Sequence, residues 1–337
     1  MMHAILTDGV SMSGKQTSEV ELSSQRKTSS IGTNKVEYQP LTEKNLEGVY
    51  DLLKRNEPFY HAISLEYFRR GTLGDEAYDP YLTLVLPDPE TDKPIAAFIG
   101  VVKKGWVRKN CYLKVCIVDQ QYQRQGIGSK MLEELIHRAR RKLHWYDDIR
   151  YGDSAPRYWQ PGVDLRHTSL VFFLKKLGFE IRGMRYNLTC SLDAINKEPE
   201  SERNGFRFER VKPSDFKATV QFVKKNFRLG TWSREVPISF ENDPPTTYIA
   251  KDGSRNIIGF ASHGTFFPGC FGPTGVKKSL RGKGIGGELL KWCLWDMKQT
   301  GIETCTIMWV TGDTIKFYSK VLGAYINPVF QTMSRRI

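Results

Sequence analysis

The sequence lacks any hydrophobic run long enough to cross a bilayer and any cysteine spacing typical of a metal site. A spanning helix needs ~20 consecutive apolar residues, and no stretch of the 337 residues approaches this. The six cysteines form no CxxC pair, and most lie in apolar contexts where we expect them to be reduced and buried. We therefore expect no metal ligands, no membrane partner and a soluble, cytoplasmic protein, although nothing in the sequence separates cytoplasm from nucleus.

Acidic residues are fewer than basic ones. The chain has 37 Asp and Glu against 50 Lys and Arg, which gives a formal net charge of +13. A positive charge favours an anionic partner such as a nucleotide, a nucleic acid or an acidic surface, although a basic surface without any partner explains it equally well. Basic residues occur throughout the chain and the known nucleic-acid-binding motifs are missing, so nucleic acid is not predicted as a partner.

A turn rich in glycine and basic residues occurs twice. Residues 123–128 read QRQGIG, and residues 281–286, found 158 positions later, read RGKGIG. Each copy follows an apolar stretch and opens an amphipathic helix, where free backbone N–H groups and positive charge can bind an anion. The spacing fits neither a Walker A loop nor a dinucleotide fingerprint. One copy could equally serve tight packing, but two copies at the same place in a repeated order favour phosphate binding.

The elements around the two turns follow the same order. A disordered tail is predicted for residues 1–35, a first unit for 36–193, a linker for 194–205 and a second unit for 206–337. The expected strands before the turns are 81–86, 95–102 and 112–118 in the first unit and 247–250 and 257–261 in the second. Two further strands, 180–182 and 186–190, are expected to complete the first unit. The late helices, 169–177 and 314–322, each end at a glycine.

Both turns match the Q/R-x-x-G-x-G/A acetyl-CoA signature of the GNAT superfamily of N-acetyltransferases. Beyond the tail, nearly the whole chain resembles two GNAT domains in tandem, which implies a mixed α/β fold and acetyl-CoA as co-substrate. In that family the turn binds the pyrophosphate through backbone amides, and the preceding strand pairs with the pantetheine. By motif position, the resemblance implies these cofactor-binding residues: Val118, Gln123, Arg124, Gln125, Gly126, Ile127, Gly128 and Ser129 in the first unit, and Val276, Arg281, Gly282, Lys283, Gly284, Ile285, Gly286 and Gly287 in the second.

The resemblance also implies a catalytic acid, Tyr318. GNAT enzymes carry a tyrosine on the late helix that protonates the departing CoA thiolate, whereas simple packing of a helix face is the alternative role. The matching residue of the first unit is Phe173, which has no proton to donate. This asymmetry predicts that the second unit performs the chemistry, while the intact turn of the first unit leaves a second active site open. Glycines and a proline in 270–275 depart from the family pattern and predict an irregular pantetheine strand.

The predicted function is acetyl-CoA-dependent transfer of an acetyl group to a primary amine, on either a small molecule or a protein. The alternative is a non-catalytic sensor or scaffold that binds acyl-CoA or a metabolite. Candidates for the base that deprotonates the amine are His263, Glu241 and Asp313, although a structural or surface role explains each more readily. The aromatic loop 151–164 suits a wall of the substrate cleft, or packing against the core. The amine, acyl chain length and oligomeric state are left open.

Overall fold

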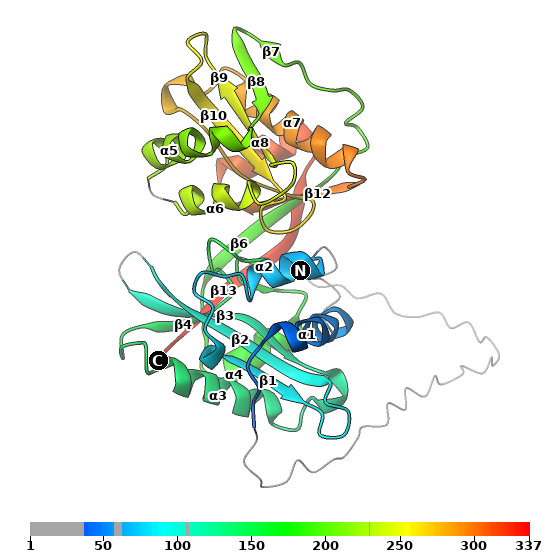
Figure 1. Ribbon diagram of the computed structural model, residues 1–337, viewed down its shortest axis with the longest axis vertical. Coiled ribbons are helices and arrows are strands. Elements are labelled where there is room, and N and C mark those ends of the chain that lie inside the picture. Colours follow the sequence, from blue (N-terminus) through cyan, green and yellow to red (C-terminus); the bar gives the residue numbers. More distant parts are fainter. Residues whose placement is uncertain (1–36, 57–62, 106–107, 229) are drawn as a thin grey trace, which may run out of the picture.

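The computed structural model describes residues 37–56, 63–105, 108–228 and 230–337 (Figure 1). The predicted disordered tail, residues 1–35, lies outside these ranges. The fold is α/β, with a mixed sheet and two halves that repeat one arrangement of elements, as the sequence predicts.

One sheet runs through both halves. Its strands follow the order β1-β2-β3-β4-β13-β6-β12-β11-β10-β9-β8-β7. Their bounds, in that order, are Thr83–Pro87, Pro94–Lys104, Lys109–Val118, Asp148–Tyr151, Tyr325–Arg336, Glu180–Ser191, Thr304–Val310, Cys270–Val276, Ile257–His263, Thr247–Lys251, Phe206–Arg210 and Glu202–Arg203. A two-residue strand, β5 (Val163–Asp164), also pairs with β13.

Helices cover both faces of the sheet in each half. Their bounds are α1 Glu43–Asn56, α2 Leu65–Gly71, α3 Ile127–Ala139, α4 Thr168–Lys176, α5 Phe216–Asn226, α6 Trp232–Ser239, α7 Ile285–Gln299 and α8 Asp313–Leu322. In the first half, one core lies against α3 and α4 and another against α1 and α2. In the second half, α7 and α8 cover one core, and α5 and α6 cover the other. Apolar residues at helical spacing, such as Leu132, Leu135 and Ile136 of α3, form these cores.

The last strand of the chain completes the sheet of the first half. Strand β13 pairs with β4 and β6, while β6 also pairs with β12 of the second half. In Figure 1, β6 and β13 run side by side from one half to the other. The domain boundaries at 193 and 206 stay a prediction, but the strand pairing crosses them. The predicted linker also contains a strand, β7, which pairs with β8.

The local expectations about strands were partly wrong. The two strands expected at 180–182 and 186–190 are one strand, β6, because an extended backbone continues through Gly183. Near the start of the described chain, Gln39 forms only an isolated bridge with Val85. By contrast, the irregularity expected in 270–275 is confirmed: this stretch forms most of strand β11, and its register with β10 shifts.

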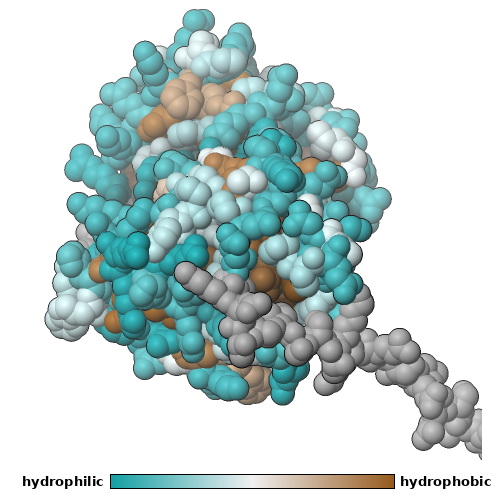
Figure 2. Space-filling view, turned by 60° about the horizontal axis from the view of Figure 1, so that its bottom comes forward, coloured by the Kyte–Doolittle hydropathy of each residue, from teal (hydrophilic) through white to brown (hydrophobic). Residues whose placement is uncertain are grey.

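No helix within the described ranges is both long and apolar enough to cross a bilayer. The face shown in Figure 2 is mostly hydrophilic, and its hydrophobic groups form small separate areas. Scattered apolar groups of this kind are ordinary on a folded protein.

Candidate active site

The two glycine turns have nearly identical backbone geometry. Gly126 (φ 82°) and Gly284 (φ 81°) adopt the left-handed conformation immediately before α3 and α7. The side chain of the first motif residue bonds the end of the preceding strand in both copies. Gln123 Nε2 donates to the Val118 carbonyl at 2.9 Å, and Arg281 Nε donates to the Val276 carbonyl at 3.4 Å.

Each turn presents unpaired helix amides to open space. The amides of the first helical turn have no acceptor within a helix, and the helix dipole adds positive potential there. The residues at 123–126 and 281–284 are exposed, and a Cβ on Gly126 or Gly284 would meet no atom within 4 Å. The implied cofactor residues of each half therefore lie together, around a helix N-terminus of the kind that binds phosphate. Their role in binding stays a prediction.

The strand before each turn separates from its parallel neighbour. Strand β3 pairs with β4 only up to Leu113 and Tyr151, and strand β11 pairs with β12 only at Cys270 and Phe271. The remainder of β3 and of β11 thus leaves a strand edge unpaired on that side. Such an edge can bond an extended ligand in the manner of an added strand.

A bulge marks the same position in each half, but its residue differs. Lys114 is the extra residue of β3 opposite β2, and Gly272 lies in the corresponding bulge of β11, 158 positions later. Gly272 adopts φ 125°, and a Cβ there would meet nothing within 4 Å. The point of divergence is therefore open in the second half, whereas a lysine side chain extends from it in the first half.

Tyr318 lies at the divergence of β11 and β12. Its ring packs edge-on against Phe271, the last β11 residue that pairs with β12, with ring centroids 6.0 Å apart. Burial raises the pKa of the Tyr318 hydroxyl above its usual value, so the group keeps its proton. Within the described chain this hydroxyl makes no hydrogen bond. In the first half, Phe173 lies elsewhere, against Gly128 in the first turn of α3.

Comparison with known proteins identifies the family. The model of the acetyltransferase (GNAT) family matches residues 46–151 and again residues 216–324, which together make up more than half of the chain. The chain belongs to the GNAT family. It carries two GNAT domains in tandem, and the family uses acyl-CoA to transfer an acyl group to an acceptor. No curated protein matches the whole sequence.

Solved structures share the tandem fold at low sequence identity. A fungal glucosamine N-acetyltransferase region within a multidomain GH3 β-N-acetylglucosaminidase has a TM-score of 0.68 at 19% identity, over 90% of this chain and 38% of that chain. A tandem GNAT protein of the clavulanic acid biosynthesis pathway has a TM-score of 0.62 at 15% identity, with 88% and 97% covered. The N-myristoyltransferase of Saccharomyces cerevisiae has a TM-score of 0.60 at 12% identity, with 89% and 78% covered. This chain therefore spans well under half of the fungal protein.

Packed side chains surround the Lys114 amine in the first GNAT half. Lys114 Nζ lies 2.5 Å from Asp75 Oδ2, and Lys103 Nζ lies 2.8 Å from the same oxygen. Burial lowers the pKa of Lys114 to about 8, an effect that the Asp75 carboxylate partly offsets. Trp159 lies beside this cluster, stacked on Phe68. The cavity beside Lys114 holds only about 10 Å³.

A much larger cavity, of about 710 Å³, lies between the two GNAT halves. The second half contributes Thr231 and Arg234, where α6 begins, and Trp309 near the end of β12. The first half contributes residues of β2, β3 and β4 and the loop after β4, including Asp153. Asp153 and Trp309 are equivalent, because each is the second residue after the last pair between the diverging strands. Both have a left-handed backbone, with φ 58° and 51°.

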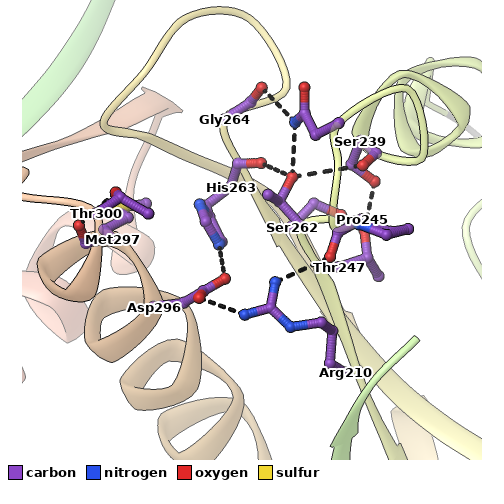
Figure 3. A network of polar contacts seen from close by, with 12 residues as sticks. Arg210, Ser239, Pro245, Thr247, Ser262, His263, Gly264, Asp296, Met297 and Thr300 are labelled. Atoms are coloured by element: carbon purple, nitrogen blue, oxygen red, sulfur yellow. Dashed lines mark hydrogen bonds and ion pairs between the residues drawn. The ribbon is translucent and has the colours of Figure 1, made fainter. Parts of the chain in front are cut away.

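The three base candidates from the sequence lie outside the lining of this cavity. His263 Nε2 lies 2.8 Å from Asp296 Oδ2 on α7, and Arg210 pairs with the other oxygen of that carboxylate (Figure 3). Burial opposes ionisation of Asp296, but His263 and Arg210 hold its pKa below the usual value. Glu241 forms an ion pair with Arg157 of the first half at 2.5 Å. Asp313 is exposed in the first turn of α8.

Two carboxyl groups near the cavity, Asp153 and Glu235, were not predicted from the sequence. Burial raises the pKa of Asp153 to about 6, although Arg150 and Arg185 oppose the effect. Burial also raises the pKa of Glu235 on α6 to about 7, and this carboxylate accepts a hydrogen bond from the Thr231 hydroxyl. Perturbed carboxyls beside a cavity are candidates for acid–base work. No spacing in the sequence marks either residue.

Loop 151–164 both packs against the core and lines the cavity. Tyr158 and Trp159 are buried, and the Tyr158 ring contacts Phe266 and Trp309 of the second half. Asp153 and Ala155 line the 710 Å³ cavity. The packing interpretation of the loop is therefore confirmed, and its role as a wall of the substrate cleft stays a prediction.

Proposed function

We propose that the chain is an acetyl-CoA-dependent N-acetyltransferase whose chemistry takes place in the second GNAT half, on a primary amine. The observation that carries this proposal is the position of Tyr318. Its hydroxyl is protonated and has no hydrogen-bond partner in the described chain. The Tyr318 ring packs against Phe271, the residue at which β11 separates from β12. The open bulge at Gly272 supports the same half.

The residues of the second half suit direct transfer in a ternary complex. The acceptor nitrogen forms a bond to the acetyl carbon, the carbon–sulfur bond breaks, and the nitrogen loses one proton. The bulge leaves Gly272 outside the regular ladder, so its amide is the candidate donor that polarises the thioester oxygen. Tyr318 gives its proton to the departing sulfur. The turn at 281–286 holds the diphosphate.

The first GNAT half has the features of a cofactor-binding unit without turnover. Its turn matches that of the second half, yet Phe173 replaces the tyrosine and Lys114 extends from the bulge. Around Lys114 itself, the cluster with Lys103 and Asp75 leaves a cavity of only about 10 Å³. We propose that this half binds acyl-CoA without turning it over. Binding of this kind is what the second candidate function, a sensor, would require.

Release of CoA thiol across a panel of amines tests the proposal. The panel includes glucosamine, because a structural neighbour acts on it, and the thioesters range from acetyl- to myristoyl-CoA, because another neighbour uses the longer chain. We expect turnover with acetyl-CoA. Binding of acyl-CoA with no thiol release from any amine, even at high protein concentration, would establish the sensor instead.

Tyr318→Phe separates catalysis from binding. We expect kcat to fall by about 10²-fold, the lower end of a general acid's contribution, while the Kd for CoA stays within about twofold. Tyr325→Phe is the matched control, because Tyr325 is exposed. Equal kcat in Tyr318→Phe and the wild type would remove this residue from the mechanism.

A further inference from the structure

We propose that the 710 Å³ cavity is an acceptor site shared by both halves and that it selects a small amine carrying a carboxylate or phosphate group. Asp153 of the first half would bind the amine and accept its proton, while Arg234 and Lys104 would bind the acidic group. This inference rests on the proposed function and names its substrate class. The cavity volume suits a small molecule.

The position of the cavity follows from the repeat. Asp153 and Trp309 occupy equivalent positions just beyond the two diverging strand pairs, and both line the cavity. Each holds a left-handed backbone that is costly for a residue with a side chain. Strain of this kind at matching positions indicates a site that the surrounding structure maintains. The cavity therefore takes its lining both from the strand end of the second half, at Trp309, and from the loop of the first half, at Asp153.

The charge of the cavity favours an anion. Its lining includes five basic residues, Lys103, Lys104, Arg108, Arg150 and Arg234, against two acidic residues, Asp148 and Asp153. Several are neutralised locally: Arg150 pairs with Asp153 at 2.8 Å, and Arg336 pairs with Asp148 at 3.4 Å. In the described part of the chain, neither Arg234 nor Lys104 forms an ion pair. Their charges are left for a ligand, and a guanidinium suits both carboxylate and phosphate.

Asp153 supplies the negative charge that would bind the amine group of the same substrate. Its side chain is 15% exposed, and Oδ2 accepts a hydrogen bond from Arg150. Oδ1 has no hydrogen-bond partner among the described residues and can accept an N–H from an ammonium group. The ammonium passes one proton to this oxygen before the nitrogen–carbon bond forms, because only the neutral amine has a lone pair for the attack. The second proton, which the nitrogen loses as the bond forms, balances the proton that Tyr318 gives to the departing sulfur. An ion pair between Asp153 and an amine would not by itself require a cavity. A small molecule that carries both an amine and an acidic group would use the carboxylate and the basic residues of the lining together.

Matched pairs of acceptors test the selectivity. Glucosamine 6-phosphate is compared with glucosamine, and free lysine with lysine amide, so that the phosphate and carboxylate sources are distinguished. We expect at least one acidic member to exceed its neutral partner about tenfold or more in kcat/KM. In Arg234→Ala this ratio should fall to about threefold or less, while Arg140→Ala, an exposed arginine at the end of α3, should keep it. Equal use of both members of each pair, or an unchanged ratio in Arg234→Ala, would overturn the proposal.

The pH profile tests Asp153. Arg150, Arg185, Tyr112, Tyr158 and Glu235 all interact with this carboxyl electrostatically. The acidic limb of kcat/KM thus belongs to Asp153 and Glu235 together. We expect activity to fall as the pH drops through about 6, and Asp153→Asn to lower kcat/KM about 10²-fold and to change that limb. An unchanged limb in this variant would exclude Asp153 as the base; its thermal unfolding and CoA affinity verify that it folds.

Direct binding separates this inference from the proposed function. If no amine is acetylated, calorimetry still measures the binding of the same acceptor pairs to the cavity. Binding of an acidic amine that Arg234→Ala weakens tenfold would support the cavity in a protein that is not an enzyme. Absence of binding in the wild type, together with turnover of neutral amines, would leave the proposed function standing and reject the acidic substrate class.

Discussion

Glu235 is a buried carboxyl whose charged form is costly to the fold. Its residue is 3% exposed on α6, and the Thr231 hydroxyl donates a hydrogen bond to it. Burial raises its pKa from 4.5 to about 7, so the folded state holds the proton more tightly than the unfolded state between these values. Stability from this group is therefore full below pH ~4.5 and is lost as the pH rises through about 7.

Glu235→Gln should reverse this loss. We expect the variant to exceed the wild type by about 1–3 kcal/mol in free energy of unfolding at pH 8, because an uncharged amide replaces a buried charge. The difference should vanish near pH 4.5. Denaturant unfolding at both pH values measures it, with the exposed Glu198→Gln as control. A constant difference across the pH range would mean that Glu235 titrates normally.

The residues that the sequence could not reveal share one property. Tyr318 and the turn residues were predicted because the resemblance to the GNAT family places them by motif position. Asp153 and Glu235 gain significance only from burial and from neighbours far away in sequence. Asp153 in particular stands in a loop whose aromatic residues dominate the pattern. Desolvation is a property of the packed molecule, and a single sequence carries little trace of it.

At the scale of elements, the two turns and their helices are the most predictable part of the molecule. Glycine at a left-handed position, followed by an amphipathic helix, fixes the geometry locally. Elements whose structure depends on contacts with residues far away in the sequence were harder to predict. Strand β4 is short and half polar, with the sequence DIRY, and Pro237 lies inside α6. The pairing of β13 with β4 joins residues almost 190 positions apart, which no local pattern encodes.

The CoA-binding stoichiometry of variants with bulky residues in the turns should show how many cofactor sites bind CoA. Val at position 126 or 284 would project into the open space beside the helix amides. We expect Gly126→Val and Gly284→Val each to remove CoA binding at its own turn, so that calorimetric stoichiometry falls from two to one. Gly301→Val is the matched control, because Gly301 has φ 81° and equally open surroundings away from both turns. Stoichiometry that stays at two in either variant would reject that turn as a cofactor site.

At the scale of the whole molecule, the halves depend on each other. Strand β13 is the last strand of the second half in sequence, yet its buried Met333 belongs to the core under α3 and α4 of the first half. Strand β6 in turn closes the sheet beside β12. The Arg157–Glu241 pair and the contact of Tyr158 with Phe266 add further links between the halves. The halves resemble separate domains in sequence but share one sheet.

Removal of residues 325–337 should disrupt the first half, although its own sequence is intact. Strands β4 and β6 would lose their common neighbour, and the core would lose Met333. We expect a loss of cooperative thermal unfolding and rapid proteolysis within residues 37–193. A synthetic peptide of residues 325–337 should restore part of the protection, and full-length Met333→Leu, which keeps the volume, should change Tm little. A truncated protein with the Tm of the full chain would contradict this account.

The position of β13 has a consequence for synthesis on the ribosome. Translation delivers β4 and β6 long before residues 325–336 emerge, and proteins usually complete their N-terminal domain first. Here the nascent N-terminal half must wait with two unpaired strand edges, which can recruit strands from other chains. The last residues to be translated thus finish the half that was made first, and a cell that produces this protein has to shield those edges until then.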